Sequence, residues 1–568
     1  MVVHAEGRCA LRILAALLEA IAMTDSHWLR RDLLRAGGIG AAIAAVPAAS
    51  LAGAGAQAAS DAPAGAAFDV RKYGATGDGK TLDTDAVNRA IEAAAAAGGG
   101  VVVFPAGQYL CFSIHLKSQV HLVLQQGCTI VAADSPLPGG QTGYNGGTYD
   151  AAEPNAPWES YQDYGHNHWH NSLIWGEGLH DFSITGTGLI WGKGLSRGSG
   201  SAAVGPAFVA EQAGVGNKAI ALKNCRNVLL RDFSILKGGH FGLLLTGVDN
   251  LTIDNLRIDT DRDGMDIDCC QNVRVSNCTV NSPWDDGICP KSSFALGHAR
   301  VTRNLTIANC YVTGCYELGS VLDGSFKKFA PEMRVSRTGR IKFGTESNGG
   351  FINVAIANCV FEGCHGYALE SVDGAMLEDF TITNTVMRDL ASPPLFMRLG
   401  ARLRGPKEST QVGTMKRILL SNLECYNAPM AISSILSGIP GHALEDIKLA
   451  GILIETAGGA SAEAARVQPP EAESKYPEPN MFGPTPSSGF YLRHVRNLEM
   501  SHVEIANATP DARPAFCLDN VERADFFAIT APRGAGGAFA LRGVKDFRIG
   551  WSRAAADAVL SDVTAKVL

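Results

Sequence analysis

The 568-residue sequence lacks a net positive charge, an aromatic-rich composition and any zinc-type cysteine pair. A formal net charge of −7 provides no global attraction to nucleic acid or to an anionic membrane surface. Aromatic residues make up only 7% of the chain, and 64 glycines are unusual for a helical protein. No two of the 14 cysteines have CxxC spacing, which argues against a zinc site. We therefore expect no nucleic-acid partner, no metal and no other cofactor.

The cysteines recur within one motif, at Asn277-Cys278, Asn309-Cys310 and Asn358-Cys359. A cysteine at a repeated position behaves as a small apolar side chain, so we expect these thiols to stack in the interior. Disulfide bridging, which an exported protein would allow, is the alternative.

Residues 1–58 have the pattern of an export leader. Arg30 and Arg31 precede an apolar run rich in Ala and Gly, and Ala54-Gly55-Ala56 offers a cleavage site. The pattern resembles a twin-arginine signal and predicts a periplasmic or extracellular location. Because the run is built from Ala and Gly rather than Leu and Ile, we expect no stable membrane anchor, which is the alternative. Met23 is a second candidate start besides Met1.

Residues 66–568 are predicted to form one domain, which opens with a capping segment over residues 66–110. Its first part has the pattern of a strand and a glycine-rich turn. Apolar residues at helical spacing after Asp83 or Thr84 predict a short helix, which the glycines at 98–100 would end. A helix between strands this early suits a cap over the open end of a stack of strands.

A block of the form Asn-apolar-x-apolar recurs along the chain. It appears at Asn227, Asn250, Asn272, Asn304 and Asn353, and the first two steps are 23 and 22 residues. Alternation inside each block predicts strands, and recurrence near 22 residues predicts one block per turn of a solenoid. The fold class indicated is all-β, a right-handed parallel β-helix with asparagines and cysteines stacked from coil to coil. A β-propeller is the alternative, but its blades need about twice this period.

Two insertions interrupt the repeats. Residues 134–172 are rich in Gly, Pro, Tyr and Trp and end in the pattern His166-x-His168-x-His170, and residues 458–488 are rich in Ala, Glu and Pro. Long loops on a rigid repeat commonly contain binding residues. For the histidines we favour a polar, aromatic wall for a sugar or a structural role, with metal ligation as the alternative.

Acidic residues concentrate at 259–268 and 285–286. Asp263 and Asp285 are 22 positions apart, so a 22-residue coil would place them at equivalent positions on neighbouring coils, with Asp286 beside them. Adjacent strands lie about 4.8 Å apart, and three carboxyls that close cannot all ionise easily, which predicts at least one raised pKa. A protonated acid beside ionised carboxylates is what hydrolysis of a glycosidic bond requires. A solvated Asp-Asp-Gly turn is the alternative.

Two cations follow further along the repeat. Arg340 and Lys342 fall on the same face of a strand by alternation and are placed to grip a carboxylate on a substrate. A basic strand on the surface is the alternative interpretation.

As a set, four segments resemble glycoside hydrolase family 28, the polygalacturonases and rhamnogalacturonan hydrolases: Val70 to Gly79, Asp263 to Asp266, Asp285 to Ile288 with Lys291, and Arg340 to Lys342. The resemblance spans roughly residues 66–520. It implies single-displacement, inverting hydrolysis of α-galacturonide bonds in pectic polysaccharides or oligosaccharides. It also implies roles for the candidate residues: Asp285 as general acid, Asp263 and Asp286 holding the water, Arg340 and Lys342 binding a galacturonate carboxylate, and Lys291 as a further substrate-binding residue.

The sequence departs from the family at one functional position. The Gly-His-Gly motif of polygalacturonases would fall near Glu317-Leu318-Gly319, which has no histidine, and rhamnogalacturonan hydrolases resemble the chain in this respect. Rhamnogalacturonan hydrolysis is therefore the first alternative function. A pectate-lyase-like enzyme, which would need a basic proton abstractor and commonly calcium, and a non-catalytic carbohydrate-binding β-helix are the others. We expect a monomer.

Overall fold

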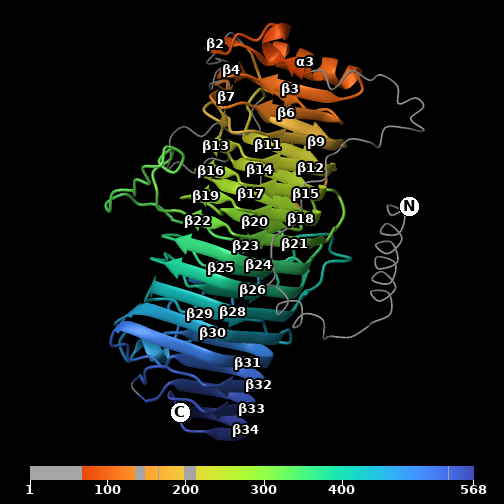
Figure 1. The fold of residues 1–568 in the computed structure, drawn as a ribbon. Helices are drawn as coiled ribbons and strands as arrows, with labels where there is room; N and C mark the ends of the chain where they lie inside the picture. Colours follow the sequence, from red (N-terminus) through yellow and green to blue (C-terminus); the bar gives the residue numbers. More distant parts are fainter. Residues whose placement is uncertain (1–66, 135–146, 164, 198–212, 535) are drawn as a thin grey trace, which may run out of the picture. The chain divides into compact units, whose positions relative to one another are not determined.

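The computed structural model describes residues 67–134, 147–163, 165–197, 213–534 and 536–568. They form a right-handed parallel β-helix, whose strands stack as successive coils along one axis (Figure 1). The fold class predicted from the repeats is therefore confirmed. The predicted leader and part of the first insertion lie outside the described residues. Within the described ranges, no helix is both long enough and apolar enough to cross a membrane.

The strands divide into a small sheet and a large one. The small sheet has the order β20-β17-β14-β11-β8-β5 and is parallel throughout. Its members are β5 (Ile114–His115), β8 (Ile174–Glu177), β11 (Lys218–Lys223), β14 (Phe241–Thr246), β17 (Asp263–Asp268) and β20 (Ile288–Lys291).

The large sheet has 28 strands among the described residues. The first part comprises β1 (Ala67–Asp69), β2 (Asp78–Leu82), β3 (Gly100–Phe104), β4 (Gly107–Cys111), β6 (Val120–Leu124), β7 (Cys128–Ala132), β9 (His180–Thr185), β10 (Leu189–Trp191), β12 (Arg226–Arg231), β13 (Ser234–Leu236), β15 (Asp249–Asp254), β16 (Arg257–Asp259), β18 (Gln271–Ser276), β19 (Thr279–Asn281), β21 (Thr302–Ala308), β22 (Tyr311–Thr313) and β23 (Lys342–Phe343). The second part comprises β24 (Phe351–Glu362), β25 (Tyr367–Ser371), β26 (Met376–Arg388), β27 (Leu395–Leu399), β28 (Thr414–Ala428), β29 (Ser434–Ser437), β30 (Leu444–Gly458), β31 (Phe490–Thr509), β32 (Phe516–Phe527), β33 (Phe539–Gly550) and β34 (Ala558–Val567).

The interior of the coils is filled by ladders of apolar side chains. In one ladder the residues of successive strands pair in register and all are buried, namely Val228, Leu251, Val273, Leu305 and Val354. Each such side chain contributes about 1.5–3 kcal/mol when it leaves water, so the repeat stabilises itself coil by coil.

The asparagine at the start of each block makes a corner. Asn227, Asn250, Asn272, Asn304 and Asn353 have φ between 52° and 59°, a left-handed conformation that asparagine tolerates better than most residues. Their amides bond from coil to coil, as in Asn250 Nδ2 to Asn227 Oδ1 at 2.9 Å and Asn353 Nδ2 to Asn304 Oδ1 at 3.1 Å. The predicted asparagine stacking is confirmed.

The thirteen cysteines of the described residues are all buried and free. Cys278, Cys310 and Cys359 lie in the core cluster, as predicted for small apolar side chains in a stack. No disulfide is found among the described cysteines, so the alternative of bridging is wrong for them.

The N-terminal coil is covered by α3 (Thr84–Ala96), the helix expected there. Asp83 is its N-cap residue, but the Asp83 carboxylate bonds outside the helix, to the backbone N–H groups of Thr76 at 2.7 Å and Gly77 at 3.0 Å. The helix start is thereby tied to the glycine-rich turn before β2. At the other end, β34 pairs antiparallel with β33.

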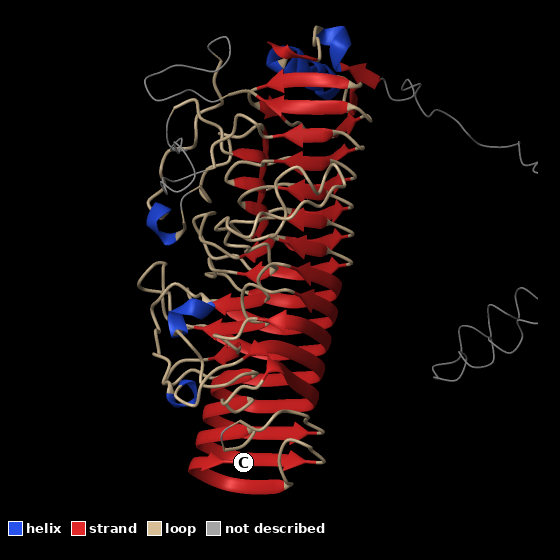
Figure 2. Cartoon of the chain, turned by 90° about the vertical axis from the view of Figure 1, so that its left-hand side faces the viewer, coloured by secondary structure: helices blue, strands red, loops and turns tan. Residues whose placement is uncertain are grey.

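Long loops gather along one side of the stack of coils (Figure 2). Residues 459–489 join β30 to β31, and residues 292–301 follow β20. The opposite side of the stack is formed by strands.

Candidate active site

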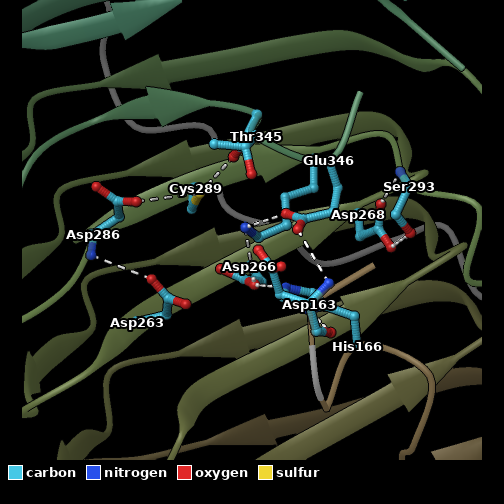
Figure 3. Close-up of polar contacts among 12 residues, drawn as sticks. Asp163, His166, Asp263, Asp266, Asp268, Asp286, Cys289, Ser293, Thr345 and Glu346 are labelled. Atoms are coloured by element: carbon cyan, nitrogen blue, oxygen red, sulfur yellow. Dashed lines mark hydrogen bonds and ion pairs between the residues drawn. The ribbon is translucent and has the colours of Figure 1, made fainter. Parts of the chain in front are cut away.

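The three acidic candidates lie together. Asp263 begins β17, and Asp285 and Asp286 lie in the turn before β20. Carboxylate oxygens of all three lie within 4.8 Å of one another. Figure 3 shows two of them, where the Asp286 backbone N–H donates to Asp263 Oδ1 at 3.2 Å. The sequence prediction that neighbouring coils bring these carboxyls together is confirmed.

The pairing inside the trio differs from the expected one. Met265 of β17 pairs with Ile288 of β20, an offset of 23 residues, so Asp263 is level with Asp286. The expectation that Asp263 and Asp285 occupy equivalent positions is wrong, because this coil contains one residue more than a 22-residue repeat. Asp285 lies one position outward, with 27% of its side chain exposed.

The carboxyls of Asp263 and Asp286 have opposite electrostatic environments. Burial raises the pKa of Asp263 well above its usual value, and Asp285 and Asp266 add to the shift by charge repulsion. Burial also acts to raise the pKa of Asp286, but Arg340 and Lys342 outweigh it and hold that pKa well below the usual range. Of this pair, Asp263 therefore holds a proton to higher pH than Asp286 does.

Arg340 and Lys342 form the cationic wall of the site. Arg340 Nε donates to Asp286 Oδ1 at 2.7 Å, and Lys342 Nζ lies 3.1 Å from Asp286 Oδ2. Both side chains are at least 97% buried, so the alternative of a basic surface strand is wrong. The carboxylate of Glu478, from the loop at 459–489, also contacts both: Arg340 Nη1 donates to its Oε2 at 3.1 Å, and Lys342 Nζ is 3.7 Å from its Oε1.

Lys291, at the end of β20, is held inside a second group of charges. Its Nζ lies 3.0 Å from Glu346 Oε2 and 3.8 Å from Asp266 Oδ2. His166 Nε2 lies 3.1 Å from Asp266 Oδ2, and its Nδ1 lies 2.9 Å from the Asp163 carbonyl oxygen (Figure 3). Each ring nitrogen of His166 thus faces an oxygen that can accept a hydrogen bond. Although burial opposes it, the pKa of His166 is raised by Glu346 and by the bond to Asp266.

These groups surround a polar pocket of about 300 Å³, large enough for a small ligand. It is lined by Asp163, His166, His240, Arg262, Asp263, Asp285, Asp286, Lys291, Lys342 and Tyr476. Five of the six predicted site residues line this pocket, and the sixth, Arg340, contacts it by donating to Asp286. Arg262, one of the lining residues, is held by Asp285, whose Oδ2 lies 2.7 Å from Arg262 Nη2.

The histidine triplet of the first insertion does not converge on one ion. His166, His168 and His170 bond to three different carboxylates, those of Asp266, Glu159 and Glu177 respectively. Two groups in the described ranges bring three metal-type ligands within 4.8 Å: the aspartate trio and Glu153, His170 and Glu177. Lys223 Nζ lies 2.9 Å from Glu177, which already neutralises part of the second group. The expectation of a metal-free site stays a prediction.

Three residues at or beside the pocket were not predicted from the sequence, namely His240, Glu346 and Glu478, because none of them belongs to a repeated pattern. His240 lies one coil before Asp263, and burial together with the charge of Arg262 holds its pKa well below the usual value, so its ring is neutral. No histidine takes the expected place near Leu318, where instead the Gly319 backbone N–H donates to Asp259 at 2.8 Å. Glu346 follows the Arg340–Lys342 segment by four residues and belongs to no repeated pattern, and Glu478 stands in an insertion.

Comparisons with known proteins agree with this fold. A family model described as rhamnogalacturonase A/epimerase, pectate lyase-like, matches residues 67–162, and one for a right-handed β-helix region matches residues 209–297. The family 28 exopolygalacturonase of Yersinia enterocolitica superposes with a TM-score of 0.57 at 19% identity, covering 82% of this chain and 78% of that chain.

Sequence relatives match over shorter lengths. A polygalacturonase of Chamaecyparis obtusa is 24% identical over 228 residues, 38% of this chain and 38% of that enzyme. Alginate lyase 7 of Azotobacter vinelandii is 44% identical over 66 residues, which are 12% of this chain and 8% of that enzyme. The chain thus spans well under two thirds of the length of either relative. The resemblance to glycoside hydrolase family 28 is confirmed at the level of the fold: the chain is a right-handed parallel β-helix of the kind found in the family 28 exopolygalacturonase.

Proposed function

We propose that the protein is an exported glycoside hydrolase that cleaves α-galacturonide linkages of pectic polysaccharides or oligosaccharides. The observation that supports it is one pocket in which a half-buried aspartate, Asp285, lies beside a carboxyl whose pKa is raised, Asp263, and one whose pKa is lowered, Asp286. Glycosidic hydrolysis needs a proton donor for the leaving oxygen and a carboxylate that activates water. Export is proposed from the leader pattern at residues 1–58 alone.

The roles follow from exposure and charge. Asp285 is the most accessible carboxyl of the trio and is proposed as the general acid toward the leaving oxygen. The proton that Asp263 holds most readily is proposed to pass to Asp285 and from there to the leaving oxygen. Asp263 and Asp286 lie deeper and are proposed to hold the attacking water. As the water oxygen bonds to the anomeric carbon, the water gives one proton to the Asp263 carboxylate, which restores the starting state. Arg262 contacts Asp285 and steadies its orientation.

The stereochemistry is a proposal of its own. Carboxyls this close suit a retaining mechanism in most glycosidases, whereas the family resemblance implies inversion with water held inside the trio. We propose inversion, and following the anomeric proton of the first product by NMR tests it. A product that keeps the anomeric configuration of the substrate would refute this part.

The central experiment combines a fragment panel with Asp285→Asn. We expect hydrolysis of galacturonan or rhamnogalacturonan fragments to fall by about a thousandfold, because a positioned acid typically contributes ~10²–10⁴-fold, while fragment binding is retained. Glu463→Gln, an exposed substitution of the same charge change, is the control. A protein whose carbohydrate-dependent function survives Asp285→Asn would be a non-catalytic β-helix.

Rhamnogalacturonan hydrolysis is the second candidate. It is favoured by the absence of a histidine near Leu318 and by the carboxylate that already contacts Arg340 and Lys342. The same panel separates the two, because only one substrate alternates galacturonate with an uncharged sugar.

A further inference from the structure

Arg340 and Lys342 already contact a carboxylate of the protein itself, that of Glu478. Glu478 meets the guanidinium of Arg340 with both oxygens, and Lys342 Nζ lies 3.7 Å from Glu478 Oε1. Three quarters of the Glu478 side chain is shielded from solvent. A two-point contact between a planar guanidinium and a carboxylate is the arrangement by which proteins bind a carboxylate on a ligand.

The loop that presents Glu478 is fastened to the coils. Arg398 Nη2 donates to the Glu471 carbonyl oxygen at 2.7 Å, and Arg493 Nη1 donates to the Pro469 carbonyl oxygen at 2.9 Å. Phe482 is buried, with the guanidinium carbons of Arg398 and Arg493 5.2 and 5.3 Å from its ring centre. These contacts hold the loop on both sides of Glu478 and so keep this residue beside Arg340 and Lys342.

The local charges are already balanced. Two cations, Arg340 and Lys342, face two ionised carboxylates, Asp286 and Glu478, whose pKa values are both lowered by these cations against the effect of burial. A third carboxyl, Glu370, lies 3.9 Å from Lys342 Nζ and has no hydrogen-bond partner on either oxygen. Burial raises its pKa to about 8, which keeps it uncharged at neutral pH. Arg340 and Lys342 together therefore do not keep Glu370 ionised at neutral pH, although Glu370 lies beside Lys342.

We propose that Glu478 is a specificity-determining residue, which occupies Arg340 and Lys342 in place of a substrate carboxylate and so selects an uncharged sugar ring next to them. The inference rests on the proposed function and deepens it. The substrate class is a pectic backbone in which a neutral sugar alternates with galacturonate, rather than an unbroken galacturonate chain. A uronate at this position would place a further negative charge against Glu478 and Asp286, with which Arg340 and Lys342 are already paired.

Fragment binding in the Asp285→Asn background tests the proposal without turnover. Calorimetry compares an oligogalacturonide with an equally long rhamnogalacturonan fragment, for chains with Glu478 and with Glu478→Gln. With Glu478 present we expect the alternating fragment to bind at least about tenfold more tightly. Glu478→Gln keeps the size of the side chain and removes its charge, so the preference is expected to shrink about tenfold through tighter galacturonide binding.

Two controls frame the comparison. Glu478→Asp keeps the charge and is expected to keep the preference, and Glu463→Gln changes the same charge at an exposed site of the same loop and is expected to change nothing. Retained affinity for the alternating fragment shows that the Glu478→Gln pocket is folded. An unchanged ratio in that variant, or a galacturonide preference with Glu478 in place, overturns the proposal. Failure of both fragments to bind any variant would instead overturn the proposed function beneath it.

Discussion

Asp286→Asn should destabilise the protein far more than Asp285→Asn, although the two residues are adjacent. The Asp286 carboxylate is 3% exposed and accepts from Arg340 Nε at 2.7 Å while Lys342 Nζ lies 3.1 Å from its other oxygen. An asparagine retains one acceptor, but its NH₂ group would face the Lys342 ammonium, donor against donor. One buried cation would be left without its main counter-charge.

The expected magnitudes follow from burial. Breaking one side of a buried ion pair costs about 3–5 kcal/mol, since the remaining charge stays desolvated. Asp285 and Arg262 are 27% and 31% exposed, and a pair in that setting contributes about 0–1 kcal/mol. The difference between the two variants should therefore be at least ~2 kcal/mol.

Urea denaturation followed by fluorescence, with hydrogen exchange at β20 and β23, measures the difference. We expect a lower urea midpoint and faster exchange in these strands for Asp286→Asn only, while both variants lose hydrolysis. The sign with pH is set by the lowered pKa of Asp286: its contribution is present above its unfolded pKa near 3.8 and is lost as the pH falls through the lower folded value. Equal midpoints for the two variants at pH 7 would refute the reasoning.

Two further substitutions probe the scaffold and the buried acid. Glu370→Gln should become more stable relative to the unsubstituted chain as the pH rises from about 4.5 to about 8. The raised pKa of Glu370 in the folded protein stabilises the fold fully below the unfolded pKa near 4.5, and this stabilisation is lost as the pH passes the folded pKa. Thermal melting across this range measures the difference between the two chains, and a difference that does not change with pH would contradict the prediction. Asn309 has φ 58° and its amide bonds to Asn277 and Asn358 on the neighbouring coils. Asn309→Ala should lower the free energy of unfolding by about 1–2 kcal/mol, and Asn309→Gly by less, because glycine adopts this backbone angle without strain. Equal losses for the two variants in urea denaturation would show that backbone strain is not involved.

The fold could be predicted because its determinants are local and repeated. An asparagine at the start of each repeated block, such as Asn250 or Asn272, indicates a left-handed backbone and an amide contact with the next coil. The alternation of apolar and polar residues after it indicates which face of the strand is buried. The trio of carboxyls could be predicted for the same reason, with an error of one residue in pairing Asp263 with Asp285. That error arose where one coil takes an extra residue in its turn, a change that spacing alone does not reveal.

The contacts made by loops could not be predicted. Glu478 lies 138 residues from Arg340 in the chain, and no periodicity relates the two. The same holds for Asp163 and Arg404, whose side chains meet at 2.6 Å across 241 residues. Such pairs depend on how an insertion folds back over the coils, and this is set by tertiary packing.

The asparagine corners have a consequence for how this architecture can change. Asn304 and Asn353 are 49 residues apart, yet they make the same amide contact as Asn250 and Asn227, which are 23 apart. The same amide contact therefore forms whether 23 or 49 residues separate the two asparagines, so the inserted residues do not change how the strands pair. A loop such as the one bearing Glu478 can be lengthened, shortened or exchanged while the strands that position Asp263 and Asp286 keep their register. Substrate choice and bond cleavage can therefore diverge independently within one column of coils.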